Sequence, residues 1–280
     1  MRKWLCIFIV LLCGGCSSKL AYDNLDWLIY WYMDDYVELK DRQEALFDKK
    51  LDSWIDWHRS EELSKYQQQL QQLQQHIKND ALDRQTIAWH LEKGKNHIDA
   101  IRNKLAPELA QLASRLDDEQ VIYLFAALER ENEEEEESIR ERLEESKEER
   151  IEDLVDDIED EFEDRLGDLT DQQEQIIARY APQFERSGMH WIAYRRDIQN
   201  AARRLFITRS SSDTFVQDLT YLLENPDDYR SDEYLKLREE NRQRYLDMAA
   251  ELVPTMTNEQ KDHLLDKVDG WLEDISSLKG

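Results

Sequence analysis

The sequence has little of what interrupts or cross-links a protein chain. Its 280 residues include only 7 glycines and 4 prolines, so turns should be few and regular elements long. The three cysteines, Cys6, Cys13 and Cys16, all fall at the start of the chain, and the rest cannot form a disulfide. The fold must therefore be stabilised by packing alone. The length allows one large domain or two small ones.

The patterns of a catalytic site are also missing. The sequence has no glycine-rich phosphate loop and no Ser-His-Asp or Cys-His arrangement that could be argued. His90 and His97 lie seven apart and share a helix face, but Lys93 and Gly94 between them cannot complete a zinc site. The glutamates at 133–137 point in different directions on a helix, which does not favour tight calcium binding. We therefore predict no enzyme, no cofactor and no metal site.

Basic residues are scarce, because 37 lysines and arginines face 63 aspartates and glutamates, for a net charge of −26. Without residues 1–15, which hold two basic residues and no acidic one, the net charge becomes −28. Such a charge repels nucleic acid, so we expect no nucleic-acid partner. The charge is uneven: residues 129–165 carry a net −15 and residues 179–209 a net +5. We favour packing of these two segments together; the alternative is a basic groove for an anionic envelope component.

Apolar residues recur at helical spacing along most of the chain. The clearest stripe, over residues 87–116, steps by three or four residues and predicts a bundle or coiled-coil seam. Pro107 lies within it and should kink or break the helix near Leu105. A stripe also persists through the acidic residues 117–166, which predicts one long acidic helix with a weak point at 132–138.

The remaining stripes complete an all-α prediction. We expect helices over residues 41–78, 170–187 and 189–223, a helix from Ser231 to about Leu252, and a last one over 257–276. The fold class is therefore an elongated multi-helix bundle with one long acidic helix. A sub-division of the domain near 166–169 would fit the glycine at 167.

The aromatic-rich residues 22–39 allow two interpretations. Leu25, Leu28 and Ile29 share one helical face, and Trp27 and Trp31 lie on its flank. The favoured interpretation is a central core helix with neighbours on several sides. The alternative places the aromatic side chains in a lipid headgroup layer.

A pentapeptide recurs four times, with Leu or Met first, Asp or Asn third and Gln fifth. Thr170, Thr257 or Asp117 can accept a hydrogen bond from the backbone three residues later, while the glutamine reaches back to the cap. Lys40 cannot act in this way, so Asp41 would have to substitute for it. The copies mark helix starts, each contributing about 1 kcal/mol, and are Leu39–Gln43, Leu116–Gln120, Leu169–Gln173 and Met256–Gln260.

The first 16 residues resemble the lipobox of bacterial lipoproteins. Two basic residues open the chain, an apolar run follows over residues 4–13, and two glycines precede Cys16. This run is too short to cross a bilayer, which takes about 20 residues, but is typical of a signal peptide. Cys13 stands where a lipobox usually has leucine. The alternatives are an ordinary cleavable signal and an uncleaved anchor. We expect residues 1–15 to be removed and Cys16 to carry lipid, palmitate included; Ser17 then favours the outer membrane.

Two resemblances extend this expectation. The stretches from Leu20 to Trp27 and from Trp31 to Tyr36 resemble the start of an uncharacterised family of helical lipoproteins in Gram-negative bacteria. That resemblance implies an envelope lipoprotein without a known activity. In addition, the segment Leu169–Gln173 is similar to the Leu-Thr-x-x-Gln motif of the Spy and CpxP periplasmic chaperones, helical cradles that bind unfolded clients. This second likeness covers five residues per copy.

These observations give two expected functions. One is a non-catalytic lipoprotein in the periplasm that binds a protein client, with a chaperone-like or envelope-stress role. The other is a structural or scaffolding lipoprotein of an outer-membrane assembly. An exposed apolar concave face would favour the first and a flat, charged surface the second. A cleft with several converging carboxylates or histidines would instead indicate an enzyme.

Overall fold

The computed structural model describes residues 16–279, so the predicted signal peptide lies outside the described residues. Every regular element in that range is helical and no strand occurs there, which confirms the all-α prediction. The elements are α2 (Cys16–Asp23), α3 (Leu25–Met33), α4 (Asp41–Trp57), the π-helix η1 (His58–Glu62), α5 (Leu63–Lys78), α6 (Arg84–Ala113), α7 (Asp118–Glu144), α8 (Lys147–Leu166), α9 (Asp171–Tyr180), η2 (Ala181–Gln183), α10 (Gly188–Thr208), α11 (Phe215–Glu224), η3 (Pro226–Tyr229), α12 (Asp232–Leu252), η4 (Val253–Thr255) and α13 (Asn258–Leu278).

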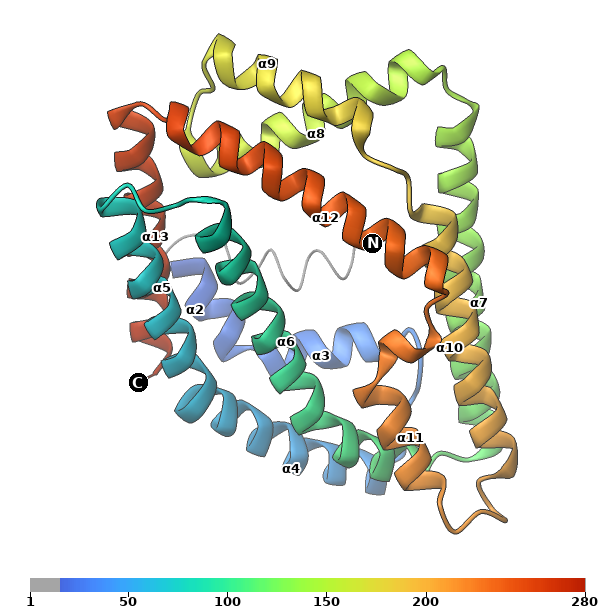
Figure 1. Cartoon of the computed structure of the whole chain (residues 1–280). Coiled ribbons are helices and arrows are strands. Elements are labelled where there is room, and N and C mark those ends of the chain that lie inside the picture. Colours follow the sequence, from blue (N-terminus) through green and yellow to red (C-terminus); the bar gives the residue numbers. More distant parts are fainter. Residues whose placement is uncertain (1–15, 280) are drawn as a thin grey trace.

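The helices follow the sides of a frame (Figure 1). The antiparallel pair α7 and α10 forms one side, α5 and α13 form the opposite side, and α12 crosses between the two near α8 and α9. Helix α6 packs on α11 and α12. The chain turns back on itself at several helix junctions, and the helices form the predicted multi-helix bundle. Within residues 16–279, no helix is both long and apolar enough to cross a bilayer.

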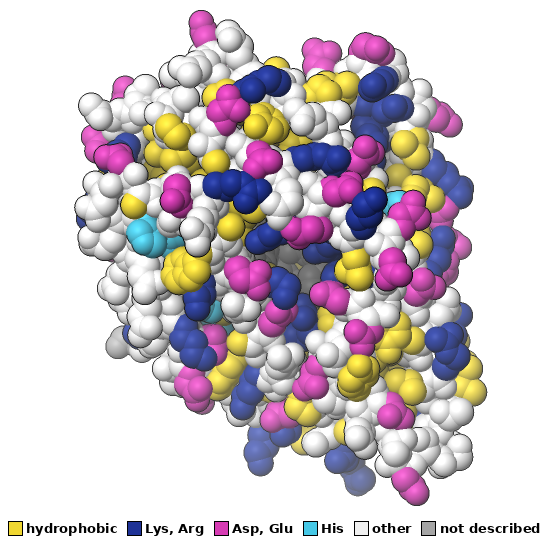
Figure 2. All heavy atoms as spheres, viewed as in Figure 1, with side chains coloured by type: hydrophobic (Ala, Val, Ile, Leu, Met, Phe, Trp, Pro, Cys, Tyr) yellow, Lys and Arg dark blue, Asp and Glu magenta, His cyan; other side chains and the backbone are white. Residues whose placement is uncertain are grey.

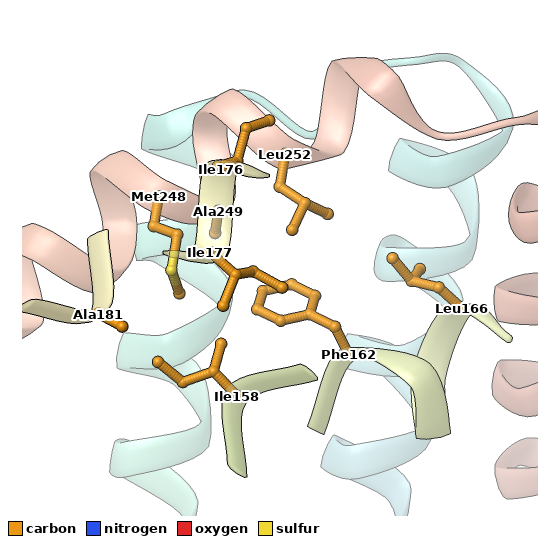
Figure 3. Close-up of a cluster of buried hydrophobic side chains, with 9 residues drawn as sticks. All are labelled: Ile158, Phe162, Leu166, Ile176, Ile177, Ala181, Met248, Ala249 and Leu252. Atoms are coloured by element: carbon orange, nitrogen blue, oxygen red, sulfur yellow. The ribbon is translucent and has the colours of Figure 1, made fainter. Parts of the chain in front are cut away.

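Several separate cores stabilise the frame. The largest joins α8, α9 and α12, whose buried side chains point toward one another around Phe162 (Figure 3). A second core packs Phe47, Leu51 and Trp54 of α4 against α6. On α6 the contact is made by Leu105, Leu109 and Leu112, which belong to the apolar stripe over residues 87–116.

Several helix boundaries differ from those predicted. The acidic segment is two helices, α7 and α8, because the chain is extended at Glu145 and Ser146; the expected weak point at 132–138 is helical. Helix α6 runs unbroken past Pro107 to Ala113. The region 189–223 is divided into α10 and α11 by a turn over residues 209–214, in which no residue is buried. Gly167, with a φ of 78°, ends α8 in the left-handed region that glycine tolerates best.

The recurring pentapeptides start α4, α7, α9 and α13, and in three of them both halves of the capping box form. In the first, Lys40 is the cap residue and only the Gln43 half is made, by a bond of 2.9 Å from the Lys40 backbone N–H. Asp41 is the first helical residue and does not cap, so the expected substitution was wrong.

The four helix starts also meet in pairs, which the sequence did not predict. Gln173 and Gln260 exchange hydrogen bonds of 2.8 Å in each direction and are 0% and 4% exposed. Gln43 and Gln120 do the same at 3.0 and 2.8 Å. Gln120 and Gln260 each also donate to the backbone carbonyl that precedes the partner's pentapeptide. The capping motif is thus also a joint between helix ends.

The interpretation of residues 22–39 as a core helix was wrong for α3, which has no buried residue. One of its faces packs on the α4 core through Ile29, Tyr30 and Met33. On the other face, Trp27 and Trp31 are 62% and 47% exposed, and their rings stack with centroids 6.4 Å apart. The helix is therefore amphipathic, with an aromatic outer face.

Candidate functional site

The one site residue predicted from the sequence, Cys16, is the first residue of α2. Its side chain lies outside the described side chains, so lipidation stays a prediction. Helix α2 itself is firmly attached to the body. Tyr22 is buried with Leu63 and Leu278, and its hydroxyl lies 2.8 Å from Nδ1 of His58 in the π-helix.

The histidines of α6 contact residues of α5. His90 and His97 are not brought together; instead His76 of α5 approaches His90 of α6, with 2.9 Å between ring nitrogens. His97 contacts Gln69 at 2.6 Å. Burial and the neighbouring His76 lower the pKa of His90 to about 4. Among the described residues, no group of three or more His, Cys, Asp or Glu side chains is placed to hold a metal ion.

The basic segment packs on the acidic one, as favoured, through a limited set of ion pairs. Arg195 donates to Glu131 at 2.7 Å, and Arg196 contacts Glu136 at 2.6 Å and Glu129 at 3.1 Å. These pairs join α10 to α7. Arg196 in turn lowers the pKa of the Glu136 carboxyl through its hydrogen bond. Figure 2 shows side chains of both charges interspersed over one face of the molecule.

The described part of the chain contains a surface cleft of about 780 Å³ beside the break between α7 and α8. A capping box creates the break: Ser146 Oγ accepts from the Glu149 backbone N–H at 3.1 Å, and the Glu149 carboxylate accepts from the Ser146 N–H at 2.9 Å. Because α8 starts in a new direction there, apolar side chains of α7 and α8 line a cleft together with residues of α10 and α12.

The floor of the cleft is apolar and its edge is charged. Ile139, Leu154, Ile158, Phe184 and Trp191 line it. Leu143 and Met189 also line it and remain 43% and 41% exposed. At Gly188, the first residue of α10, a Cβ would come within 3.1 Å of the Ile139 side chain. Glycine thus lets α10 approach α7 closely at this point.

Three arginines from different segments lie along the same cleft. Arg150 donates to the carbonyls of Leu143 and Glu145 at 3.0 and 2.8 Å, and so fastens the end of α7. Arg142 donates to the Ser138 carbonyl at 3.3 Å. Arg186 forms no hydrogen bond or ion pair with any residue in the range 16–279. Burial and the nearby Arg150 and Arg142 lower its pKa, although the guanidinium stays charged.

Two buried polar atoms beside the cleft also lack a hydrogen-bond partner among the described residues, Nε1 of Trp191 and Oε2 of Glu145. The cleft therefore has an apolar floor, with a hydrogen-bond donor and a hydrogen-bond acceptor at its edge. Such a surface can bind a chain segment that offers apolar side chains and hydrogen-bonding groups.

The basic segment seen in the sequence includes Arg186, but neither Arg142 and Arg150 nor the cleft itself was predicted. The signal that could have located it is the S-x-x-E pattern of Ser146 and Glu149, which marks a helix start inside the acidic stretch. Nothing in the sequence pattern indicates that Leu154, Met189 and Trp191 line the same cleft.

The fold and cleft define an all-helical protein with an apolar surface cleft. Residues 35–235 match a family of unknown function, DUF6279, and the chain belongs to this family. This agrees with the expected membership of an uncharacterised family. No curated protein and no solved structure is significantly similar to the chain, and the expected likeness to the Spy and CpxP chaperones is not shown.

Proposed function

We propose that the protein is a lipoprotein, anchored at Cys16 in the outer membrane and facing the periplasm, that binds other proteins without catalysis. The cleft between α7, α8, α10 and α12 carries this proposal. It combines an apolar floor with exposed Leu143 and Met189 and with the unpaired cation of Arg186. Such a surface is more costly to leave in water than the mixed charges elsewhere, and a bound segment would cover it.

A client-binding role is favoured over scaffolding because a second apolar groove lies on the same helix pair. Ile122 of α7 and Ile207 of α10 are 70% and 73% exposed, and they border a groove of about 660 Å³ beside Phe125. Two concave apolar surfaces on one pair of helices resemble a cradle more than the flat, charged surface expected of a scaffold.

The binding role can be tested with a client protein that aggregates when it unfolds. We expect the purified protein to suppress this aggregation, and the double change Leu143→Asp with Met189→Asp to abolish most of the effect. Ile98→Asp is the matched control, because Ile98 is 47% exposed on α6 and does not line the cleft. Equal suppression by all three proteins would contradict a role for the cleft.

A specific partner would be found by placing a photo-crosslinking residue at Met189 in intact cells, with Ile98 again as the control position. Partners captured at Met189 and lost when Arg186 is changed to Glu would support specific binding. Capture of the same proteins at both positions would contradict it.

The anchor is tested separately. Cys16→Ala should leave an unprocessed precursor and abolish labelling with palmitate. Normal labelling of that variant would disprove lipidation at Cys16.

A further inference from the structure

We propose that α2 and α3 lie on the membrane surface, with Trp27 and Trp31 in the layer of zwitterionic lipid headgroups. This inference rests on the proposed anchor at Cys16. It goes further, because it fixes how the body is oriented on the bilayer and names the surface that contacts lipid.

The first argument is the absence of a linker. Helix α2 starts at Cys16 itself, and Trp27 follows 11 residues later. At about 1.5 Å of rise per helical residue, 11 residues span about 16 Å. A lipid chain at Cys16 therefore holds the tryptophans of α3 near the bilayer, whose headgroup regions add about 5–8 Å on each side of the hydrocarbon.

The second argument is that α2 cannot swing away from the body. Tyr22 is 3% exposed, the Arg59 guanidinium lies 5.4 Å from its ring, and Lys19 donates to the Ser277 carbonyl at 3.1 Å. Asp23 adds an ion pair with Arg59 at 3.7 Å. These contacts fasten α2 to the π-helix and to α13. Because α2 is fixed to the rest of the protein, a lipid anchor at Cys16 also fixes how the protein is oriented on the membrane.

The third argument is the composition of the outer face. Leu20, Trp27 and Trp31 are 66%, 62% and 47% exposed on the first two helices. Tryptophan is enriched at the membrane interface, where its ring is partly buried and its N–H can reach water or headgroups. Asp26 and Asp34 are exposed near the tryptophans, and their charge disfavours anionic lipid. A zwitterionic headgroup layer therefore fits this face best.

The test uses the lipidated protein, reconstituted in phosphatidylcholine vesicles whose acyl chains carry bromine near the headgroup. Bromine quenches the fluorescence of nearby tryptophans. In the wild type we expect bromine to quench part of the tryptophan emission. In the double variant Trp27→Phe with Trp31→Phe, we expect the bromine-sensitive part of the emission to be missing. Trp89→Phe is the matched control, because Trp89 is 38% exposed on α6 and should leave the quenched part unchanged.

Two failures can be told apart by floating the vesicles before the measurement. Protein that carries no lipid and does not float overturns both the anchor and this inference. Protein that floats, but in which the double variant is quenched as strongly as the wild type, overturns only the placement of α3. In that case the aromatic face is left to a second copy or to a protein partner.

Discussion

Ser146 and Glu149 cap each other across the first turn of α8, and this reciprocal pair sets the position at which the acidic stretch changes direction. The apolar stripe alone does not place the break there, because Ile139, Leu143 and Ile151 remain at helical spacing across it. The cleft depends on this change of direction, so its geometry is linked to one small hydroxyl.

Replacing Ser146 with alanine should lower the free energy of unfolding by about 1 kcal/mol, the usual effect of losing a side-chain cap. Ser187 is the matched control, because it precedes α10 without a side-chain cap bond, and Ser187→Ala should change stability by less than about 0.5 kcal/mol. Denaturant unfolding measures both values. If the two variants lost the same free energy of unfolding, the Ser146 side chain would contribute no more to stability than a serine without a cap bond.

Replacing Gln173 with alanine should destabilise the fold more strongly, by about 2–3 kcal/mol, because it removes a cap and leaves Gln260 without its buried partner. Gln175→Ala, on the exposed face of the same helix, should have little effect. The double variant of Gln173 and Gln260 should lose less than the sum of the single changes, since one interaction is removed in both. Strict additivity would mean that the two glutamines act independently.

The ion pairs between α10 and α7 allow a comparison within one helix. Changing Arg195 and Arg196 together to glutamine should lower the melting temperature, because their glutamate partners on α7 lose their hydrogen bonds. Arg203 and Arg204 are exposed, and neither makes an ion pair with a residue in the range 16–279, so the same double change there should be nearly neutral. A larger effect at 203 and 204 would show that the wrong pair was identified.

Stability should decrease in mildly acidic solution in a way that depends on His90. Its pKa falls to about 4 in the fold from about 6.5 in the unfolded chain, so the neutral ring stabilises the fold above pH 6.5. That contribution is lost as the pH falls from 6.5 to 4, because protonation then favours the unfolded state. The difference in unfolding free energy between wild type and His90→Gln should shrink or reverse over this range. A difference that is constant with pH, or one reproduced by His190→Gln, would contradict the assignment.

Local features of the fold were predictable and long-range ones were not. The caps at Asp117, Thr170, Thr257 and Ser231 depend on residues three apart, and all form as expected. The stripe over residues 87–116 predicted helix α6, whose Leu105, Leu109 and Leu112 pack on α4. In contrast, the reciprocal glutamine pairs join residues 77 and 87 apart in the chain, and the His76–His90 contact depends on how α5 and α6 cross. Sequence spacing holds no information on such contacts.

In the candidate site, too, local features were predictable and long-range contacts were not. Arg186 belongs to a basic segment that is visible in the sequence, but its role at the cleft depends on the α7–α8 break. Cys16 was identified from its local context and stays a prediction. The exposure of Trp27 was misjudged because an aromatic residue beside an apolar stripe is usually buried, whereas α3 packs through one face only.

The two glutamine joints also bear on how the length of this chain can vary during evolution. Each joint requires only that two short helix starts meet, whatever the length of chain that connects them. Insertions and deletions between the pentapeptides should therefore be tolerated, whereas the five-residue spacing within each should be constant. In an alignment of family members, gaps should accumulate between these four segments and be absent inside them.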